Sequence, residues 1–124
     1  LGSISQDKVF NHLENADFLI HTSIREATSA IIPEALSHGL PVICHDLSGM
    51  SLAINNKCGV KIPFIAPKIS IQGFRSALIE FVENPEYLHK ISIGAKQRSG
   101  EISWDAIAAK ISNDYASIIK ETHN

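Results

Sequence analysis

The sequence predicts a parallel α/β fold, in which short buried strands alternate with helices that cover them. Three short apolar runs, at 18–21, 40–44 and 58–62, have the length of buried strands. After each of the first two runs, a polar or small-residue loop leads into a segment suited to a helix. Because parallel strands need such crossovers, about three parallel strands with helices around them are expected.

The first element is expected to be an amphipathic helix from Gln6 to Glu14. Its apolar residues fall on one face and are expected to point inward; they are Val9, Phe10 and Leu13. Ser3 and Gln6 have the spacing of a capping box, so Ser3 is expected to cap this helix.

The most informative stretch runs from Thr22 to Cys44. It begins at the end of the first strand and passes through the small-residue loop 27–30 into an apolar helix expected at 31–38. Pro33 is compatible with that helix because it falls in the first turn, and Gly39 supplies the stop before the next strand. The loop therefore follows the carboxyl end of a strand, where parallel sheets bind ligands.

The second half of the chain is expected to be mainly helical. A turn-rich loop at 45–50 could offer the N–H groups of Ser48 and Gly49 to a ligand, or it could be a plain connection. A linker with prolines is expected at 63–68, and a break at 99–101. Helices are expected at 51–55, 70–83 and 85–98, with a last helix opening at Ser103.

Cap residues and apolar periodicity support these helices. Asn84 is expected to cap the helix that starts at Pro85, and Ser103 to cap the last one. The helix at 70–83 has apolar residues at helical spacing: Ile71, Phe74, Leu78, Phe81 and Val82. The last helix has one apolar stripe, expected to pack in the core or against a partner helix: Ile107, Ile111, Tyr115 and Ile118.

Two carboxylates mark the central stretch. Glu26 opens the loop and Glu34 lies in the first helical turn, so both can face one crevice. The N–H groups between them, near a helix start, suit a phosphate, and the candidate donors are Thr28, Ser29, Ala30 and Ile31. Carboxylates would repel a phosphate but accept hydrogen bonds from sugar hydroxyls. The pattern therefore indicates a nucleotide-sugar site.

This stretch resembles the E-x7-E motif of retaining, family 4-like glycosyltransferases (glycosyl transferases group 1), which have the GT-B fold. The motif is formed by Glu26 and Glu34 and followed by Gly39-x-Pro41. The resemblance covers nearly the whole chain and extends to Asn84-Pro85 and Ser103-Trp104. It implies that residues 1–124 form the distal part of a C-terminal, nucleotide-sugar-binding domain, with a Rossmann-like parallel sheet, in a fragment of a longer chain.

The resemblance also implies roles. Glu34 would hold ribose hydroxyls, and Glu26 would lie near the anomeric carbon as nucleophile or as electrostatic support. The loop donors at 28–31 would stabilise the leaving diphosphate, and the segment 2–5 would lie near the base. No cofactor and no metal are implied, and the acceptor, a carbohydrate or a lipid-linked sugar, would bind to an absent N-terminal domain. The fragment alone is expected to be inactive.

The sequence departs from the family pattern after the first glutamate. Members usually have glycine, an aromatic residue and then proline or glycine, where this chain has Ala27, Thr28 and Ser29. Alanine replaces a glycine where the backbone approaches the ligand. A non-catalytic nucleotide- or partner-binding module of the same fold is therefore the alternative, and an unrelated flavodoxin-like regulatory domain is a third.

Composition excludes several functions. The formal net charge of −2 over 124 residues gives no electrostatic case for nucleic acid. No apolar run is long enough to span a membrane. A cytoplasmic protein is expected, with the whole enzyme peripheral to the inner face of the membrane as a further option. Uncovered apolar surface would favour self-association of the fragment. Cys44 and Cys58 are expected to be reduced core thiols.

Overall fold

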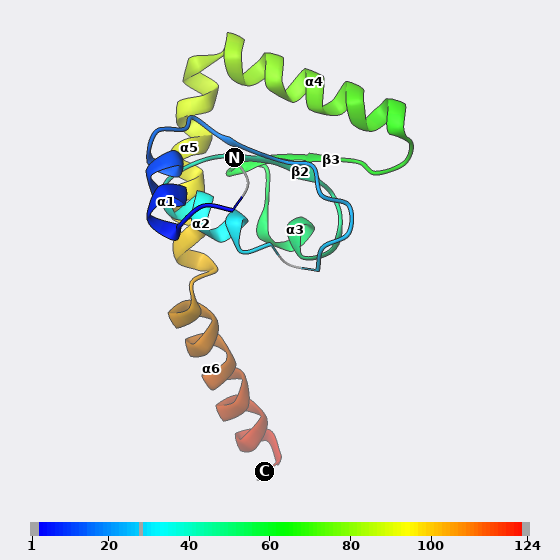
Figure 1. Ribbon diagram of the computed structural model, residues 1–124. Helices are drawn as coiled ribbons and strands as arrows, with labels where there is room; N and C mark the ends of the chain where they lie inside the picture. Colours follow the sequence, from blue (N-terminus) through cyan, green and yellow to red (C-terminus); the bar gives the residue numbers. More distant parts are fainter. Residues whose placement is uncertain (1–2, 28, 123–124) are drawn as a thin grey trace.

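The computed structural model describes residues 3–27 and 29–122, and it confirms the α/β fold class (Figure 1). Three parallel strands lie in the order β1-β2-β3, with Leu19 beside Val42 and Val42 beside Gly59. The elements in chain order are α1 (Gln6–Glu14), β1 (Leu19–His21), α2 (Ile31–Ser37), β2 (Val42–His45), α3 (Ser48–Ala53), β3 (Gly59–Ile62), α4 (Pro67–Glu83), α5 (Pro85–Glu101) and α6 (Trp104–Thr122).

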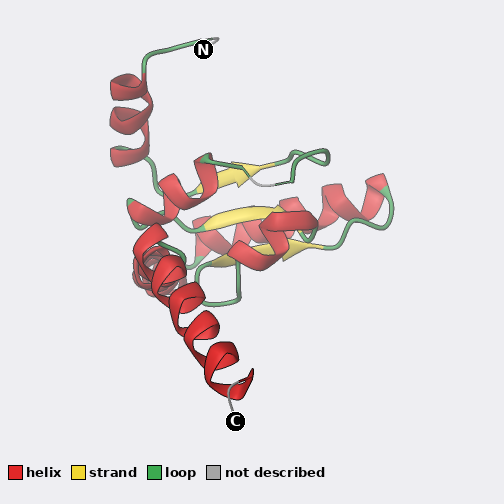
Figure 2. Ribbon diagram, turned by 90° about the horizontal axis from the view of Figure 1, so that it is seen from below, coloured by secondary structure: helices red, strands yellow, loops and turns green. Residues whose placement is uncertain are grey.

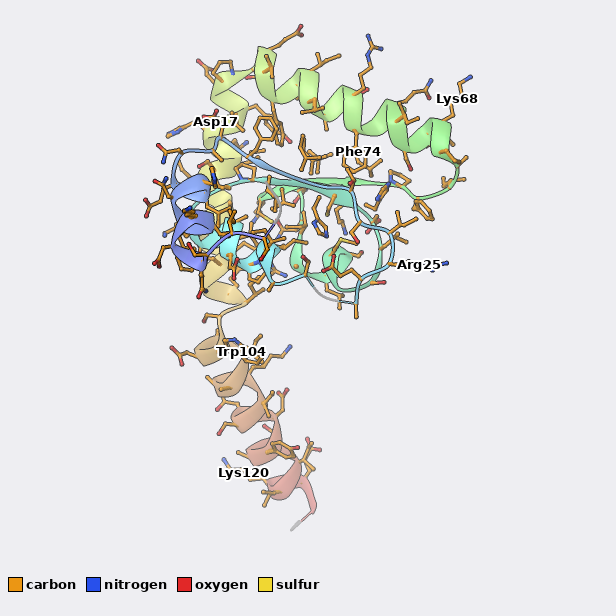
Figure 3. The ribbon with its side chains drawn as sticks, in the orientation of Figure 1. Asp17, Arg25, Lys68, Phe74, Trp104 and Lys120 are labelled. Atoms are coloured by element: carbon orange, nitrogen blue, oxygen red, sulfur yellow. The ribbon has the colours of Figure 1, made fainter. Side chains whose placement is uncertain are left out.

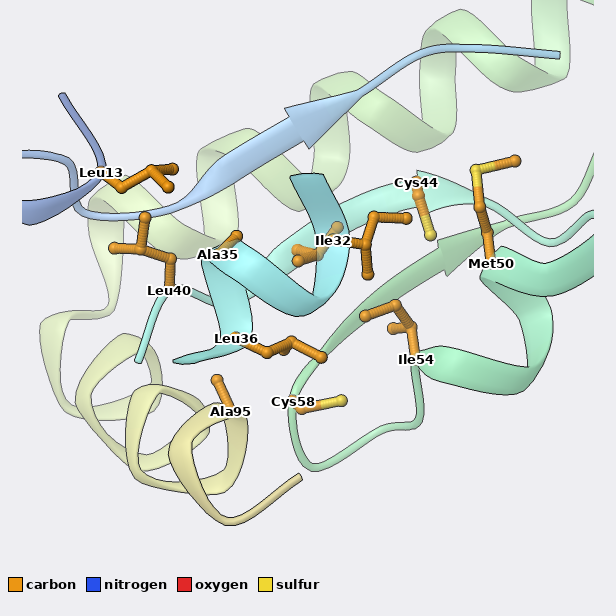
Figure 4. Close-up of a cluster of buried hydrophobic side chains, with 11 residues drawn as sticks. Leu13, Ile32, Ala35, Leu36, Leu40, Cys44, Met50, Ile54, Cys58 and Ala95 are labelled. Atoms are coloured by element: carbon orange, nitrogen blue, oxygen red, sulfur yellow. The ribbon is translucent and has the colours of Figure 1, made fainter. Parts of the chain in front are cut away.

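The sheet lies between two helical layers, with α4 on one face and α2 and α3 on the other (Figure 1). The central strand β2 contributes to both layers, because successive side chains of a strand point to opposite faces. Val42 and Cys44 pack into the cluster beneath α2, α3 and α5 (Figure 4), whereas Ile43 packs with Phe81 and Ile91. Burial on both faces explains why this strand reads as a continuous apolar run.

Helix α5 holds the end of α2 in place. Gly39 ends α2 as expected, with a φ of 76°, and its carbonyl oxygen accepts a 2.6 Å hydrogen bond from the Ser92 hydroxyl. The Lys96 ammonium donates to the carbonyl oxygen of Ser37 one turn further along α5. These two bonds fix the carboxyl end of the helix whose first turn carries Glu34.

Several boundaries differ from those expected. Helix α3 starts at Ser48 instead of residue 51, and α4 starts at Pro67, inside the expected linker, because proline is compatible with a first helical turn. The expected break at 99–101 is wrong, since α5 continues to Glu101. The Arg98 side chain donates from α5 to the carbonyl oxygens at the end of α3 and so joins the two helices.

Two of the three expected caps are confirmed. Asn84 accepts a 3.0 Å hydrogen bond from the Tyr87 N–H, and Ser103 accepts one of 3.2 Å from the Ala106 N–H. The capping box at Ser3 is wrong: Ser5 is the N-cap residue of α1 and its side chain makes no cap bond.

The last helix does not join the core. Figures 1 and 2 show α6 projecting from the body of the molecule, and every side chain from Ile107 to Glu121 is exposed. The expected core packing of its apolar stripe is therefore wrong for this chain. Two apolar residues of α4, Ile71 and Val82, are also exposed, at 69% and 70%. No helix among residues 3–27 and 29–122 has the length and apolarity to cross a membrane.

Candidate functional site

The two motif glutamates lie on the side of the sheet where the strands end. Glu26 belongs to the loop that follows β1, and Glu34 lies in the first turn of α2, which begins directly after that loop. Both side chains are partly exposed. Figure 3 shows the neighbouring Arg25 extending outward from the same loop. The arrangement agrees with the general position of ligand sites in parallel sheets.

Glu26 is held by a residue of the preceding strand. The His21 Nε2 lies 2.9 Å from Glu26 Oε2, and the two side chains are 14% and 36% exposed. The sequence pattern did not reveal this pairing. Residues five apart meet here because the chain turns sharply after β1, which periodicity alone does not show.

Glu34 presents an unengaged carboxylate. In the part of the chain that the structure describes, its side chain makes no hydrogen bond and no ion pair, although its carbonyl oxygen accepts a 2.7 Å bond from Ser37. Nδ1 of His38 also contacts that carbonyl oxygen, at 3.1 Å. The His38 ring stacks on the ring of Phe10, with 5.8 Å between the ring centroids. The backbone of α2 is therefore anchored while the carboxylate remains available to hydroxyl donors.

The expected phosphate loop is described in part. Thr28 lies outside the described residues, Ser29 is 8% exposed, Ala30 is exposed and Ile31 is partly buried. The Ile32 N–H donates to the Ser29 carbonyl oxygen at 3.2 Å, which closes the first turn of α2.

The loop after β2 packs against the loop that carries Glu26. The Gly49 N–H donates to the Ala27 carbonyl oxygen at 2.8 Å, so of the two alternatives for this N–H group the structure favours a plain connection. Ser48 adopts a φ of 48°, a left-handed conformation that a non-glycine residue rarely takes.

A cluster of polar side chains stabilises the start of α3. Asp46, which follows β2, accepts a hydrogen bond from the Ser51 hydroxyl and lies 3.3 Å from the Lys61 ammonium of β3. The bond from Ser51, and after it the contact with Lys61, lower the pKa of the Asp46 carboxyl. The sequence did not reveal the contribution of Lys61, because it depends on the pairing of β2 with β3.

His45, the last residue of β2, is directed towards α4. Its ring is 4% exposed, its Nε2 lies 3.2 Å from the Ser70 hydroxyl, and Phe74 of α4 packs edge-on against it. His45 Nδ1 has no hydrogen-bond partner among the described residues. The ring lines a cavity of about 650 Å³ between α4 and the sheet, and neither motif glutamate contributes to that cavity.

Both cysteines belong to the core of the molecule. Cys44 and Cys58 are buried and unpaired, as expected, and burial raises the pKa of the Cys44 thiol to about 11. Among residues 3–27 and 29–122, no group of three or more metal-binding side chains comes together.

Comparison with known proteins relates the whole motif region to one family. The model of the family described as "Glycosyl transferases group 1" matches residues 1–98, which leaves α6 outside the match. Among curated proteins, the D-inositol 3-phosphate glycosyltransferase of Streptomyces griseus subsp. griseus is 20% identical over 118 residues, or 95% of this chain and 24% of that protein. The corresponding enzyme of Thermobispora bispora is 24% identical over 109 residues, or 87% of this chain and 24% of that protein.

A solved structure supports the fold. Sucrose-phosphate synthase from Thermosynechococcus elongatus superimposes with a TM-score of 0.75 at 19% sequence identity, over 98% of this chain and 30% of that one. At that identity the likeness shows the fold alone. This chain spans about a quarter of the length of the two curated relatives.

Proposed function

The chain belongs to the glycosyl transferases group 1 family, and from this premise we propose that residues 1–124 form the distal part of the donor-binding domain of a larger GT-B glycosyltransferase. The whole enzyme would transfer a hexose-type sugar from a nucleotide-sugar to a carbohydrate or lipid-linked acceptor. Transfer would proceed with retention of configuration, and the enzyme would act in polysaccharide biosynthesis. We place this enzyme in the cytoplasm, peripheral to the inner face of the membrane where the acceptor is lipid-linked.

One observation carries the proposal. The Glu34 carboxylate lies at the carboxyl-end side of the sheet, partly exposed and without a protein partner among the described residues, in a stretch that the family model matches. A carboxylate of this kind would accept hydrogen bonds from the ribose hydroxyls of a nucleotide. Glu26 would face the transferred sugar, and the loop from Thr28 to Ile31 would supply N–H groups to the diphosphate.

The chemistry that these residues would perform is electrostatic. Glycosyl transfer passes through an oxocarbenium-like state, so a carboxylate at Glu26 would stabilise the positive charge that develops on the sugar. Backbone N–H groups would stabilise the negative charge on the departing diphosphate. No metal ion or cofactor is needed for either effect.

The non-catalytic alternative rests on Ala27, which replaces the usual glycine. Ala27 is exposed and its carbonyl oxygen is engaged by Gly49, so its side chain causes no burial conflict here. The two curated relatives are named as enzymes. We therefore favour a glycosyltransferase domain over a binding module.

A binding titration tests the proposal. The chain is titrated with UDP, GDP and ADP, beside a Glu34→Ala variant and a Glu83→Ala control, since Glu83 is exposed at the end of α4. Binding of one nucleotide, weakened roughly tenfold or more by Glu34→Ala and unchanged by the control, is expected when charge-assisted bonds of about 1.5–3 kcal/mol are lost. The same titration of the whole protein follows, and failure of that protein to bind any nucleotide or nucleotide-sugar would refute the proposal.

A further inference from the structure

We propose that His21 is a positioning residue for Glu26: its ring holds one carboxylate oxygen so that the other faces the donor sugar. The inference rests on the proposed function and adds a specific residue to it. The motif comparison concerns the two glutamates, whereas the geometry of the loop points to this histidine.

The position of His21 is set by the sheet. It is the last residue of β1, and its Cα pairs with that of Cys44, which is fully buried in the central strand. The imidazole therefore projects from a rigid element, and its side chain is 14% exposed. A group held this way can orient a more mobile one.

The contact with Glu26 uses a single carboxylate oxygen. Nε2 of His21 lies 2.9 Å from Oε2 of Glu26, so the ring tautomer with a proton on Nε2 donates to it. Among the described residues, Oε1 of Glu26 has no hydrogen-bond partner, and the side chain remains 36% exposed. The carboxylate therefore keeps acceptor capacity in a fixed orientation.

A second tether acts on the next residue. The Ala27 carbonyl oxygen accepts the Gly49 N–H at 2.8 Å, which ties the backbone of this loop to the first turn of α3. Glutamate has several rotatable bonds, and free rotation would spread its carboxylate over many positions. One hydrogen bond holds the backbone of this loop and another holds the carboxylate, so Glu26 is oriented before any substrate binds.

The alternative is a structural role, in which the His21–Glu26 contact only stabilises the loop. The two roles differ in what His21 controls. A structural contact would affect folding and nucleotide binding together, whereas a positioning contact would affect the sugar and the transfer step. Under the proposed function, binding of the nucleoside diphosphate depends on Glu34 and the loop N–H groups. Among the described residues, the side chain of His21 makes a hydrogen bond only to Glu26.

The test uses the whole protein of which this chain is the donor-binding part. Three variants are compared: His21→Ala, which removes the donor; His21→Gln, which restores an N–H donor at a similar reach; and His89→Ala, a control on the exposed surface of α5. For each, kcat and KM for the nucleotide-sugar, Kd for the nucleoside diphosphate and the urea midpoint are measured.

We expect the variants to differ in kcat but not in their affinity for the nucleoside diphosphate. His21→Ala lowers kcat roughly 10- to 100-fold, the range for a misplaced catalytic group, while Kd for the nucleoside diphosphate changes less than about twofold. His21→Gln recovers part of kcat, and His89→Ala matches the wild type. Equal kcat in His21→Ala and His89→Ala, or a parallel loss of nucleotide binding and folding stability, overturns this inference while leaving the proposed function intact. A wild-type protein that binds no donor refutes the proposed function, and this inference with it.

Discussion

Replacing Gly94 of α5 by alanine should destabilise the protein, although alanine is the better helix former. A Cβ atom at this position would lie 1.8 Å from the carbonyl oxygen of Lys57, whereas Cβ atoms essentially never come within 3.0 Å of a non-bonded heavy atom elsewhere in the chain. The obstacle is backbone and not the end of a flexible side chain, so α5 and the segment at Lys57 must move apart by more than 1 Å. That shift reaches α2, because Ser92 and Lys96 join the two helices.

The magnitude follows from two opposing effects. Overpacking of this kind costs about 3 kcal/mol at the upper end of its usual range. The higher helix propensity of alanine returns about 1 kcal/mol. A net loss of about 2 kcal/mol is expected, or roughly 8 °C in Tm for a domain of this size.

Gly100 provides a matched control in the same helix. Nothing lies within 4 Å of a Cβ built there, so Gly100→Ala should stabilise the protein by about 0.5–1 kcal/mol. Urea unfolding followed by circular dichroism compares both variants with the wild type. If Gly94→Ala unfolds at or above the wild-type urea concentration, the close approach of α5 to Lys57 is not present in solution and the reasoning fails.

Four further predictions address other parts of the chain. Because the hydrogen bond from Ser51 lowers the pKa of Asp46, the stability gained from its ionised form is present above the unfolded pKa of about 3.9 and is lost as pH falls through the lower folded pKa. The free energy of unfolding of Asp46→Asn should therefore depend less steeply on pH than that of the wild type between about pH 5 and 2. An unchanged pH dependence in this range would contradict the prediction. The buried Cys44 thiol, with its pKa raised to about 11, should react with a thiol reagent at pH 8 only after urea unfolds the chain, and rapid labelling of the native protein would contradict its burial. Ser48→Gly should raise the free energy of unfolding by about 1 kcal/mol, because glycine adopts the left-handed φ of 48° without strain. Thermal unfolding measures this change. A lower stability of the variant would show that contacts of the serine side chain outweigh the backbone strain. Deleting α6 (Trp104–Thr122) should leave the free energy of unfolding, measured by urea titration, within about 0.5 kcal/mol of the wild-type value, and it should abolish any self-association seen by sedimentation. A large loss of stability would show that α6 packs on the core.

Local sequence patterns account for most of the elements. The run from Val42 to Cys44 is apolar throughout because both faces of the central strand are covered, and that alone predicted a buried parallel strand. Asn84 and Gly39 mark a helix start and a helix end through properties of single residues, a side-chain acceptor and a left-handed φ. Such signals do not depend on distant parts of the chain.

The extent of the helices was harder to predict, because several signals compete. Ser99 and Gly100 favour a break, yet α5 continues to Glu101. The Arg98 side chain joins this last part of α5 to α3, and its Nη1 lies 2.7 Å from Oε2 of Glu101. Tertiary contacts of this kind override a weak local preference.

Periodicity, caps and motif spacing are local properties, so they were sufficient to predict the fold class, the order of strands and helices along the chain, and the position of Glu26 and Glu34 around one loop. The three-dimensional packing was needed to show which groups meet: His21 with Glu26, Gly49 with Ala27, and Lys61 with Asp46. It also decided that α6 lies outside the core, since an apolar stripe shows which face of a helix seeks cover but not what covers it. Contacts between elements depend on how those elements pack, and packing is a property of the whole fold.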